Sequence, residues 1–535
     1  MLLNDVEVQK TEKWKTEGFN MPNFDRTAVR ERTHKEPTWL HFGAGNIFRA
    51  LLAVMQQKLL DGGLQDKGII VAEGYDYEII DTSFTAYDDL FISVTLKADG
   101  NVEKTVVASV VESLKMDTEG FSRLKEIFAA KSLQLLSLTI TEKGYSLMGS
   151  DGVLLSDVES DFLAGPSKVK SYMGKLAALC HHRYTNGATP LTIASMDNCS
   201  NNGTLLFEVV RRYASEWAKN GLVDGGFLNY VEDPTRLSFP CSMIDKITPG
   251  PNEEVAKMLE ESGVENLDRI VTKKNTSIAP FVNAEELEYL VIEDNFPNGR
   301  PPLEKVGVII TDRETVDKVE KMKVCTCLNP LHTALALFGN LLSYTRISDA
   351  IKDETLSKLV WQIAEEGLPV VVDPGIISPT EFINSVINVR LPNPFIPDTP
   401  QRIATDTSKK ISVRFGETIK AYMDSDDLSV DKLRAIPLVL AGWCRYLVGI
   451  DDAGNPLELS PDPMLSELRK MFSDISIGHG NGSKSIPAQL LSNKEIFGVD
   501  LYETGVAELV EKYFTMMTVG TGAVRRTLET VLEIE

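Results

Sequence analysis

The sequence is poor in the residues that build metal-rich or disulfide-linked proteins. It has six cysteines and six histidines in 535 residues. The cysteines stand at positions 180, 199, 241, 325, 327 and 444. Because this is too few and too scattered for a disulfide scaffold, we expect reduced thiols. Cys325 and Cys327 lack the two-residue spacer of a zinc knuckle, and the adjacent His181 and His182 point apart on a helix. The sequence therefore predicts no metal site.

Positive charge and long apolar runs are also scarce. The chain has 55 basic and 77 acidic residues, which gives a formal net charge of −22. Such a charge repels phosphate backbones and anionic lipids. No apolar stretch reaches the length of a bilayer span, and the start MLLNDVEVQKTEKWKTEG has no cleavable apolar core. We therefore expect a cytoplasmic protein without nucleic-acid or membrane partners.

The chain changes character along its length. From Pro37 to about residue 248, short β-rich segments alternate with helical ones, which is typical of a parallel sheet with crossover helices. Proline and glycine crowd together in DNFPNGRPPLEKVG, and helical periodicity dominates after that stretch. The sequence therefore predicts an α/β fold with an exposed, charged N-terminal arm (1–36), a Rossmann-type domain (37–300) and a mainly helical substrate-binding domain (301–535).

The stretch HFGAGNIFRALL, from His41, follows the first predicted strand and opens a helix. Gly43 and Gly45 supply two glycines of a G-x-G-x-x-G turn, whose backbone N–H groups bind pyrophosphate beside a helix N-terminus. Phe48 takes the place of the third glycine, which predicts either a wider spacing between helix and strand or a ring turned outward. Arg49, next to Phe48, is a candidate for a phosphate contact.

An acidic residue at the end of the next strand supports the interpretation of a cofactor turn. Glu73 is suited to bind ribose hydroxyls and disfavours a 2′-phosphate, so NAD is preferred to NADP. Asp76 is a rival for this role. A methyltransferase also uses a glycine turn with an acid on the next strand. The candidate cofactor-binding residues are Gly43, Ala44, Gly45, Asn46, Ile47, Glu73 and Asn198.

Three polar stretches stand out against apolar surroundings: SMDNCSNNG, FPCSMIDKITP and KMKVCTCLNPLHTALA. In the third, Asn329 and His332 lie three apart, on one face of a helix, with Lys323 just upstream. Each side chain also has an ordinary alternative role. Asn198 is suited to cap a helix, and Asp245 to form a surface ion pair. The ordinary alternative for Lys323 is a solvated surface lysine. The ordinary alternative for His332 is a core histidine whose ring nitrogens are both hydrogen-bonded.

Eight motifs, in order along the chain, resemble those of the mannitol dehydrogenase family. They are HFGAGNIFRA, LTITEKGY, SMDN, FPCSMIDKITP, VIEDNFPNGRPPLEKVG, KMKVCTCLNPLHTALA, VRLPNPFIPDTPQRIATDTSKK and IPLVLAGWCRYLVGIDDAGNPLELSPDP. These polyol-specific long-chain dehydrogenases include fructuronate and tagaturonate reductases. The resemblance, from about His41 to Pro463, implies an NAD-binding Rossmann domain, a mainly helical C-terminal domain, an active site between them and zinc-independent catalysis.

The resemblance also assigns roles to matching positions. It makes Lys323 the general acid/base, with Asn198 and Asn329 flanking the reacting oxygen. It makes His332 a group that positions a neighbouring hydroxyl, and Asp245 a supporting carboxylate. This chemistry is reasonable, because burial favours the neutral form of an amine and amides stabilise an alkoxide without titrating.

The spacing departs from the family pattern at one place. Five steps usually separate the lysine from the asparagine, whereas Lys323 and Asn329 are six apart. One extra step on an α-helix turns a side chain by roughly 100°. We therefore expect either a π-bulge within VCTC or a lysine in the turn before the helix.

A sugar-acid substrate needs a fixed cation. Arg390, Arg402, Lys409 and Lys410 lie in or beside NPFIPDTPQRIATDTSKK. We expect Arg390, Lys409 and Asp245 to bind substrate. Arg390 is the first choice among the cations, because it precedes the Asn-Pro turn as the family's arginine does. The last motif looks most like the sugar-acid members.

The resemblance thus implies a metal-independent enzyme, a monomer or small homo-oligomer, in which NADH reduces the C5 ketone of D-fructuronate to D-mannonate, or the reverse. Mannitol 2-dehydrogenase and tagaturonate reductase activities are the alternatives within the family. A non-catalytic NAD(H)- or sugar-binding module is the alternative from another class.

Overall fold

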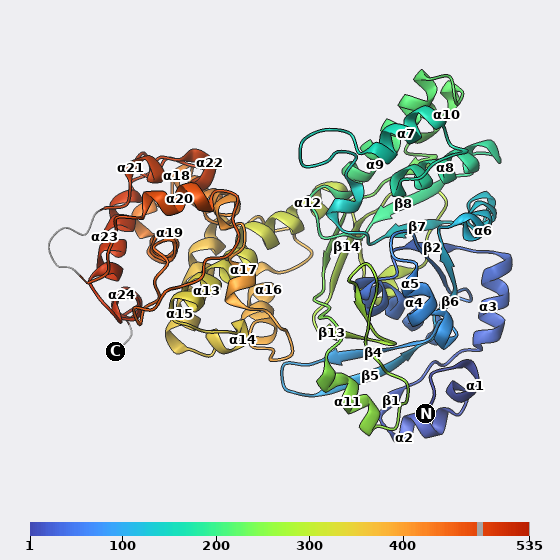
Figure 1. The fold of residues 1–535 in the computed structure, drawn as a ribbon, viewed down its shortest axis with the longest axis horizontal. Helices are drawn as coiled ribbons and strands as arrows, with labels where there is room; N and C mark the ends of the chain where they lie inside the picture. The colour runs from blue at the N-terminus through green and yellow to red at the C-terminus, as the bar shows by residue number, and fades with distance from the viewer. Residues whose placement is uncertain (479–484, 534–535) are drawn as a thin grey trace. The chain divides into compact units, whose positions relative to one another are not determined.

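A computed structural model describes residues 1–478 and 485–533. The chain forms two compact units, Met1–Asp317 (unit 1) and Lys318–Glu535 (unit 2). The division falls inside α12 (Arg313–Met322), after a segment that still contains a short strand, β15 (Ile309–Thr311) (Figure 1).

Unit 1 is organised around a parallel six-stranded sheet with the strand order β6-β3-β2-β7-β8-β9. Its strands are β2 (Trp39–Phe42), β3 (Ile69–Glu73), β6 (Val110–Lys115), β7 (Leu135–Leu138), β8 (Leu191–Ser195) and β9 (Leu237–Ser238). The chain leaves β2 in one direction toward β3 and β6, then returns to add β7 on the other side. The order therefore reverses between β2 and β7, the place where open α/β sheets bind ligands.

Both faces of this sheet are covered. Leu40 and Phe42 of β2 belong to a core cluster with residues of α6, α8, α9 and α10, whereas Trp39 belongs to a second cluster with residues of α4 and α5. The alternation follows from the two-residue period of a strand, and it explains why β2 is buried along its whole length. The helices of unit 1 are α4 (Ala53–Asp61), α5 (Glu78–Ser83), α6 (Thr118–Ala129), α7 (Ser156–Ala164), α8 (Tyr172–Thr185), α9 (Asn202–Lys219), α10 (Gly225–Glu232) and α11 (Glu253–Glu261).

Three smaller sheets extend unit 1. A four-stranded sheet has the order β1-β5-β4-β13, a three-stranded sheet the order β10-β14-β15, and β11 pairs with β12. Their strands are β1 (Phe19–Asn20), β4 (Phe91–Leu96), β5 (Val102–Val107), β10 (Ser242–Asp245), β11 (Ile270–Val271), β12 (Ser277–Ile278), β13 (Phe281–Glu285) and β14 (Tyr289–Glu293).

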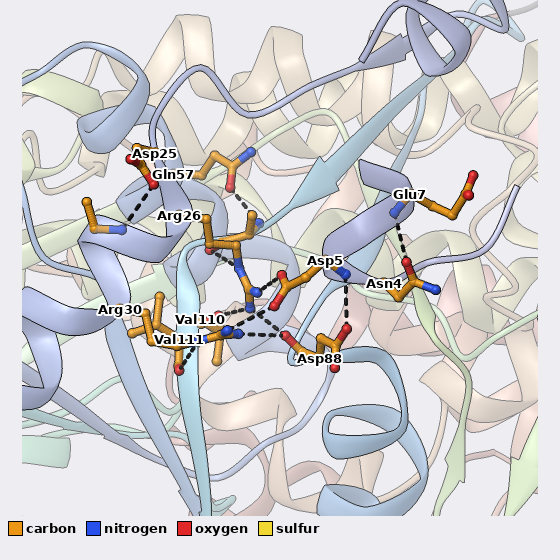
Figure 2. Close-up of polar contacts among 12 residues, drawn as sticks. Asn4, Asp5, Glu7, Asp25, Arg26, Arg30, Gln57, Asp88, Val110 and Val111 are labelled. Atoms are coloured by element: carbon orange, nitrogen blue, oxygen red, sulfur yellow. Dashed lines mark hydrogen bonds and ion pairs between the residues drawn. The ribbon is translucent and has the colours of Figure 1, made fainter. Parts of the chain in front are cut away.

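The first 36 residues are folded, so the expectation of an exposed arm is wrong. They form α1 (Asp5–Val8), α2 (Thr11–Thr16), β1 and α3 (Arg26–Lys35). Trp14 is fully buried. Figure 2 shows Arg26 and Arg30 of α3 pairing with Asp5 and donating to carbonyls of β6, with 3.0 Å from Arg26 Nη2 to Val110 O. The charges that suggested exposure therefore pair with one another and satisfy the edge of the sheet.

Unit 2 is helical and packs around α19 (Ala435–Leu447), which contacts α13, α15 and α23. All 13 residues of α19 are buried, as expected of a helix that is apolar all round. The other helices of unit 2 are α13 (Asn329–Leu341), α14 (Ile347–Ala350), α15 (Glu354–Gly367), α16 (Pro379–Ser385), α17 (Pro400–Ile403), α18 (Glu417–Met423), α20 (Leu465–Met471), α21 (Ala488–Leu491), α22 (Lys494–Phe497), α23 (Ala507–Thr518) and α24 (Ala523–Val531).

Within the described residues, four helices contain a π turn, in which backbone hydrogen bonds span five residues. These turns are η1 (Phe48–Leu52) in unit 1 and η5 (Lys323–Cys327), η7 (Val386–Arg390) and η9 (Ser412–Gly416) in unit 2. Such turns are rare and often lie at functional sites. The structure confirms the thiol expectation, since all six cysteines are free. No helix within residues 1–478 and 485–533 is long and apolar enough to cross a bilayer.

Candidate active site

The glycine turn after β2 closes tightly against the residue that follows β7. Gly43 has a φ of +105°, and a Cβ at this position would lie 2.2 Å from the carbonyl oxygen of Thr139. Its N–H donates to Ala72 O at 2.9 Å. A Cβ on Gly45 would instead meet no atom within 4 Å. Gly43 is therefore required by the backbone, whereas Gly45 leaves open space beside the turn.

Phe48 lies inside the protein, so the alternative of an outward ring is wrong. Its ring is fully buried and stacks on the imidazole of His41, with 4.2 Å between ring centroids and 9° between planes. His41 in turn contacts Ser137 Oγ at 2.7 Å and Thr139 Oγ1 at 2.9 Å. Burial lowers the pKa of His41 to about 3. The aromatic stack thus fills the space where a third glycine would let helix and strand approach.

Arg49 does not reach outward for a phosphate. Its side chain is fully buried, donates to Ala279 O at 2.7 Å and holds Asn46 Oδ1 at 2.9 Å. Burial lowers the pKa of Arg49 to about 9. The arginine therefore fixes the glycine turn from behind, because its guanidinium binds a carbonyl of a distant segment.

The carboxylate of Glu73 ties the end of β3 to the glycine turn. It accepts hydrogen bonds from Ala44 N at 2.9 Å, Tyr75 N at 2.8 Å and Asp76 N at 3.2 Å. Asp76 is buried as well and accepts from Thr272 Oγ1 at 2.6 Å. Both carboxylates line the same cavity, so the structure does not separate the two rivals for a ribose contact.

This cavity has a volume of about 500 Å³ and lies at the carboxyl ends of β2, β3 and β7. Its wall includes Gly43, Gly45, Glu73, Tyr75, Asp76, Thr139, Thr141, Lys143 and Tyr172. Ala44, Asn46 and Ile47 belong to the same turn but do not line the cavity. The volume suits a cofactor-sized ligand, and the position matches the reversal of strand order.

Asp197, which sequence reasoning passed over within SMDN, shapes one wall of the cavity. Its carboxylate accepts from Ile140 N and Thr141 N at 2.9 Å each and from the hydroxyl of Tyr145 at 2.5 Å. Burial raises the pKa of Asp197. Thr141 has a φ of +65°, so these bonds hold a loop in a conformation that threonine rarely adopts. The sequence signal that could have identified Asp197 is its position, since it is an acidic residue directly after a buried strand.

The two unit 1 candidates beyond the cofactor turn lie in different surroundings. Asn198, next to Asp197, is exposed, and Asn201, not Asn198, precedes α9. Asp245 ends β10, where it pairs in register with Tyr289, and it is buried. Asp245 is thus not an exposed carboxylate, as a surface ion pair would require.

In unit 2, the structure confirms the predicted π-bulge before Asn329. Lys323 is the first residue of η5, and its carbonyl accepts from Leu328 N at 3.1 Å, five residues on. The turn thus takes up the extra residue between α12 and α13. Lys323 is buried, which excludes the alternative of a solvated lysine.

Asn329 and His332 share the first turn of α13. The Nε2 atom of His332 is buried without a hydrogen-bond partner, and it lies 3.6 Å from Asp398 Oδ2. Burial lowers the pKa of His332 to about 4, and the nearby charge of Asp398 raises it in part. The imidazole is therefore neutral near pH 7. It is not a satisfied core histidine, because one ring nitrogen has no hydrogen bond.

The cations that sequence reasoning proposed for a sugar acid differ in burial. Arg390 ends the π turn η7 and is buried, whereas Lys409 is exposed. Arg402 is exposed and pairs with Asp398. Lys410 donates to Thr405 O, and burial lowers its pKa. Of the two cations that we expected to bind substrate, only Arg390 is thus held in a buried position.

No group of three His, Cys, Asp or Glu side chains suited to a metal ion occurs in the described parts of the chain.

The two units match two models of one family. Residues 37–305 match the mannitol dehydrogenase Rossmann domain, and residues 315–517 match the mannitol dehydrogenase C-terminal domain. A D-mannonate oxidoreductase of Thermotoga maritima is 52% identical over 536 residues, which covers 99% of each chain. A mannitol 2-dehydrogenase of Emericella nidulans is 28% identical and covers 86% of each chain.

Solved structures show the same fold. A D-sorbitol dehydrogenase in substrate-free form superposes with a TM-score of 0.81 over 99% of this chain and 100% of that chain, at 24% identity. A Pseudomonas fluorescens mannitol 2-dehydrogenase, solved as a ternary complex with NAD and D-mannitol, gives a TM-score of 0.69 at 24% identity, covering all of both chains. With both of its domains matched, this chain belongs to the mannitol dehydrogenase family.

Proposed function

We propose that this chain is an NAD-dependent oxidoreductase that interconverts D-fructuronate and D-mannonate. The observation that carries the proposal is the 52% identity, over nearly the whole of both chains, to a D-mannonate oxidoreductase. The glycine turn of unit 1 and the polar turn of α13 in unit 2 supply the two parts that such an enzyme needs: a nucleotide site and a group of side chains for a sugar hydroxyl.

The residues of unit 1 fit NAD. The open space at Gly45 lets a pyrophosphate approach the backbone, and the helix that starts at η1 adds its positive end. Glu73 and Asp76 place two carboxylates on the cavity wall, where they bind ribose hydroxyls and repel a 2′-phosphate. NAD, when bound, takes up or releases the hydride. All other steps are assigned to side chains of this chain.

Lys323 is the general acid/base of the reaction. During oxidation of D-mannonate, its amine takes the proton from the C5 hydroxyl while the hydride leaves C5; reduction runs the same transfers in reverse. The buried position of Lys323 supports this role, because a general acid/base shielded from bulk water exchanges its proton with the bound substrate. The amides of Asn198 and Asn329 stabilise the developing alkoxide without titrating. A lysine base with two amide donors makes the chemistry independent of a metal.

The remaining candidates bind and orient the sugar. The neutral imidazole of His332 has a free ring nitrogen that positions the hydroxyl next to the reacting carbon. Asp245 is a supporting carboxylate. Arg390 and Lys409 are the cations assigned to the carboxylate of the substrate, and the burial of Arg390 supports it as the stronger ligand.

A panel of substrates tests the proposal. Full-length protein is mixed with NADH and D-fructuronate, D-tagaturonate or D-fructose, and with NAD and D-arabinitol, with and without a chelator, while absorbance of NADH is followed. We expect turnover of D-fructuronate far above the others and no effect of the chelator. Preference for fructose or tagaturonate would establish one of the other family activities. Absence of turnover on all four, with NADH still bound, would establish a non-catalytic module.

A further inference from the structure

Arg414 is a partly buried cation without a partner of opposite charge. It lies in the middle of the π turn η9, in unit 2. Its side chain donates one hydrogen bond, from Nη1 to Thr333 Oγ1. Within residues 1–478 and 485–533, no carboxylate forms an ion pair with it. Burial lowers the pKa of Arg414 to about 10, which leaves the guanidinium charged at neutral pH.

A desolvated charge of this kind lowers the stability of the fold unless a ligand of opposite charge pairs with it. A desolvated cation without a counterion loses free energy of hydration and regains none of it from a salt bridge. Proteins keep such a group where an anion binds. Because Nη1 of Arg414 is occupied by Thr333, the edge formed by Nε and Nη2 remains for a ligand. That edge offers two parallel N–H donors, the geometry that matches both oxygens of a carboxylate.

The hydrogen bond to Thr333 places Arg414 at the polar turn of α13. Thr333 directly follows His332, and its hydroxyl also donates to the carbonyl of Asn329 at 2.9 Å. The charge of Arg414 acts on the imidazole of His332, as do those of Arg402 and Arg390. These three positive charges oppose protonation of His332, and Asp398, whose Oδ2 lies 3.6 Å from His332 Nε2, is paired with Arg402.

The turn that carries Arg414 is held in place from the other side. A Cβ at Gly416, the last residue of η9, would lie 2.1 Å from the carbonyl oxygen of Phe497, so the turn is pressed against α22. Phe415 is fully buried. The position of the guanidinium is thereby fixed before any ligand arrives, which lowers the entropic cost of binding.

We propose that Arg414 binds the carboxylate of the sugar acid and makes the protein select acids over neutral polyols. This inference rests on the proposed function, and it adds a specificity residue outside the NPFIPDTPQRIATDTSKK segment, in or beside which Arg390 and Lys409 lie. A carboxylate suits the site better than a phosphate, because one guanidinium balances the charge of a monoanion but leaves most of the second charge of a phosphate uncompensated.

Arginine variants test the proposal in the full-length protein with NAD. The variants are R414Q, R414K, R414A and, as a matched control, R526Q, which removes an exposed arginine from α24. Steady-state kinetics with D-mannonate and D-mannitol, NADH binding and thermal unfolding are measured for each. We expect R414Q to lower kcat/KM for D-mannonate about 100-fold, mainly through KM, and R414K to lower it about 10-fold. Turnover of D-mannitol, NADH affinity and R526Q kinetics should change less than threefold. Guanidinium ion added to R414A should restore part of the activity on D-mannonate.

The outcomes separate this inference from the proposed function. If the wild-type chain does not oxidise D-mannonate, the proposed function fails and the inference with it. If the wild type is active and R414Q keeps its KM for D-mannonate, or loses D-mannonate and D-mannitol equally, only the inference is overturned. A wild-type preference for D-fructose 6-phosphate over D-fructuronate, lost in R414Q, would replace the carboxylate by a phosphate. If R414Q does not fold, R414K decides, since a lysine keeps the charge and loses the two-pronged geometry.

Discussion

The rings of His41 and Phe48 lie face to face, 4.2 Å apart and 9° from parallel, where the glycine turn meets the sheet. His41 is on a central strand and Phe48 opens the following helix. The pair therefore replaces the close backbone packing that a third glycine would give. The packing of the helix that follows the glycine turn therefore depends on this aromatic contact.

Restoring the glycine pattern should harm the protein. Phe48→Gly removes a fully buried ring and adds backbone freedom, so we expect a loss of about 3–5 kcal/mol in the free energy of unfolding, measured with urea. Phe48→Leu, as the control, should cost less because it leaves a smaller cavity. A Phe48→Gly variant as stable as the wild type would show that the stack is not needed.

His41 should make stability depend on pH. Its folded-state pKa of about 3 lies below the value of roughly 6.5 for an unfolded chain, so only the unfolded chain binds a proton between these pH values. Stability is thus fully present above pH 6.5 and falls as the pH drops toward 3, by about 1.4 kcal/mol per pH unit from this group. His41→Gln does not titrate. Urea unfolding at pH 5 and 7 should give a smaller difference for the variant than for the wild type, and equal differences would contradict the assignment.

The two glycines of the turn should respond differently to alanine. Gly43→Ala drives a Cβ into the carbonyl of Thr139 and strains φ, so we expect poor folding or a large fall in melting temperature. Gly45→Ala meets no protein atom and should fold normally, but its methyl group occupies the space that we assign to NAD. NADH fluorescence should then show affinity weaker by about tenfold or more, roughly 1.4 kcal/mol. Unchanged NADH affinity in Gly45→Ala would place the cofactor elsewhere.

Lys323 and Lys321 form a matched pair around the start of η5. Lys323 is buried and Lys321 is exposed. Lys323→Ala should lower kcat by about 10²- to 10⁴-fold and leave NADH binding intact, as expected when a general acid/base is removed. Lys321→Ala should stay near wild-type activity. If Lys321→Ala lost activity and Lys323→Ala kept it, Lys321 would be the base and the assignment of Lys323 from the π turn would be wrong.

Much of this architecture was accessible from sequence because the patterns are local. The apolar segments before Gly43, Glu73 and Asn198 predicted strands β2, β3 and β8, and the six-residue step from Lys323 to Asn329 predicted the π turn. The strands needed only periodicity and turn chemistry, whereas the π turn was one of two alternatives drawn from the spacing that the family resemblance implies.

Other features depend on contacts between distant segments. Nothing near Arg414 in the sequence indicates that its side chain donates to Thr333 or that it is desolvated. Asp197 resembles any acid after a strand until its bonds to the loop after β7 are known. The N-terminal segment looked exposed because the partners of Arg26 are distant in sequence, with Ala108 and Val110 more than 80 residues away. Burial and pairing are properties of the packed chain, so composition does not reveal them.

The π turn at Lys323–Cys327 also shows how a helix accommodates one extra residue. The residue is absorbed by widening a single helical turn, while the segments on both sides keep their orientation. Counting residues at the α-helical period therefore misjudges which side chains share a face across this turn. The widened turn sets the position of the lysine without rebuilding the helix that carries the asparagine.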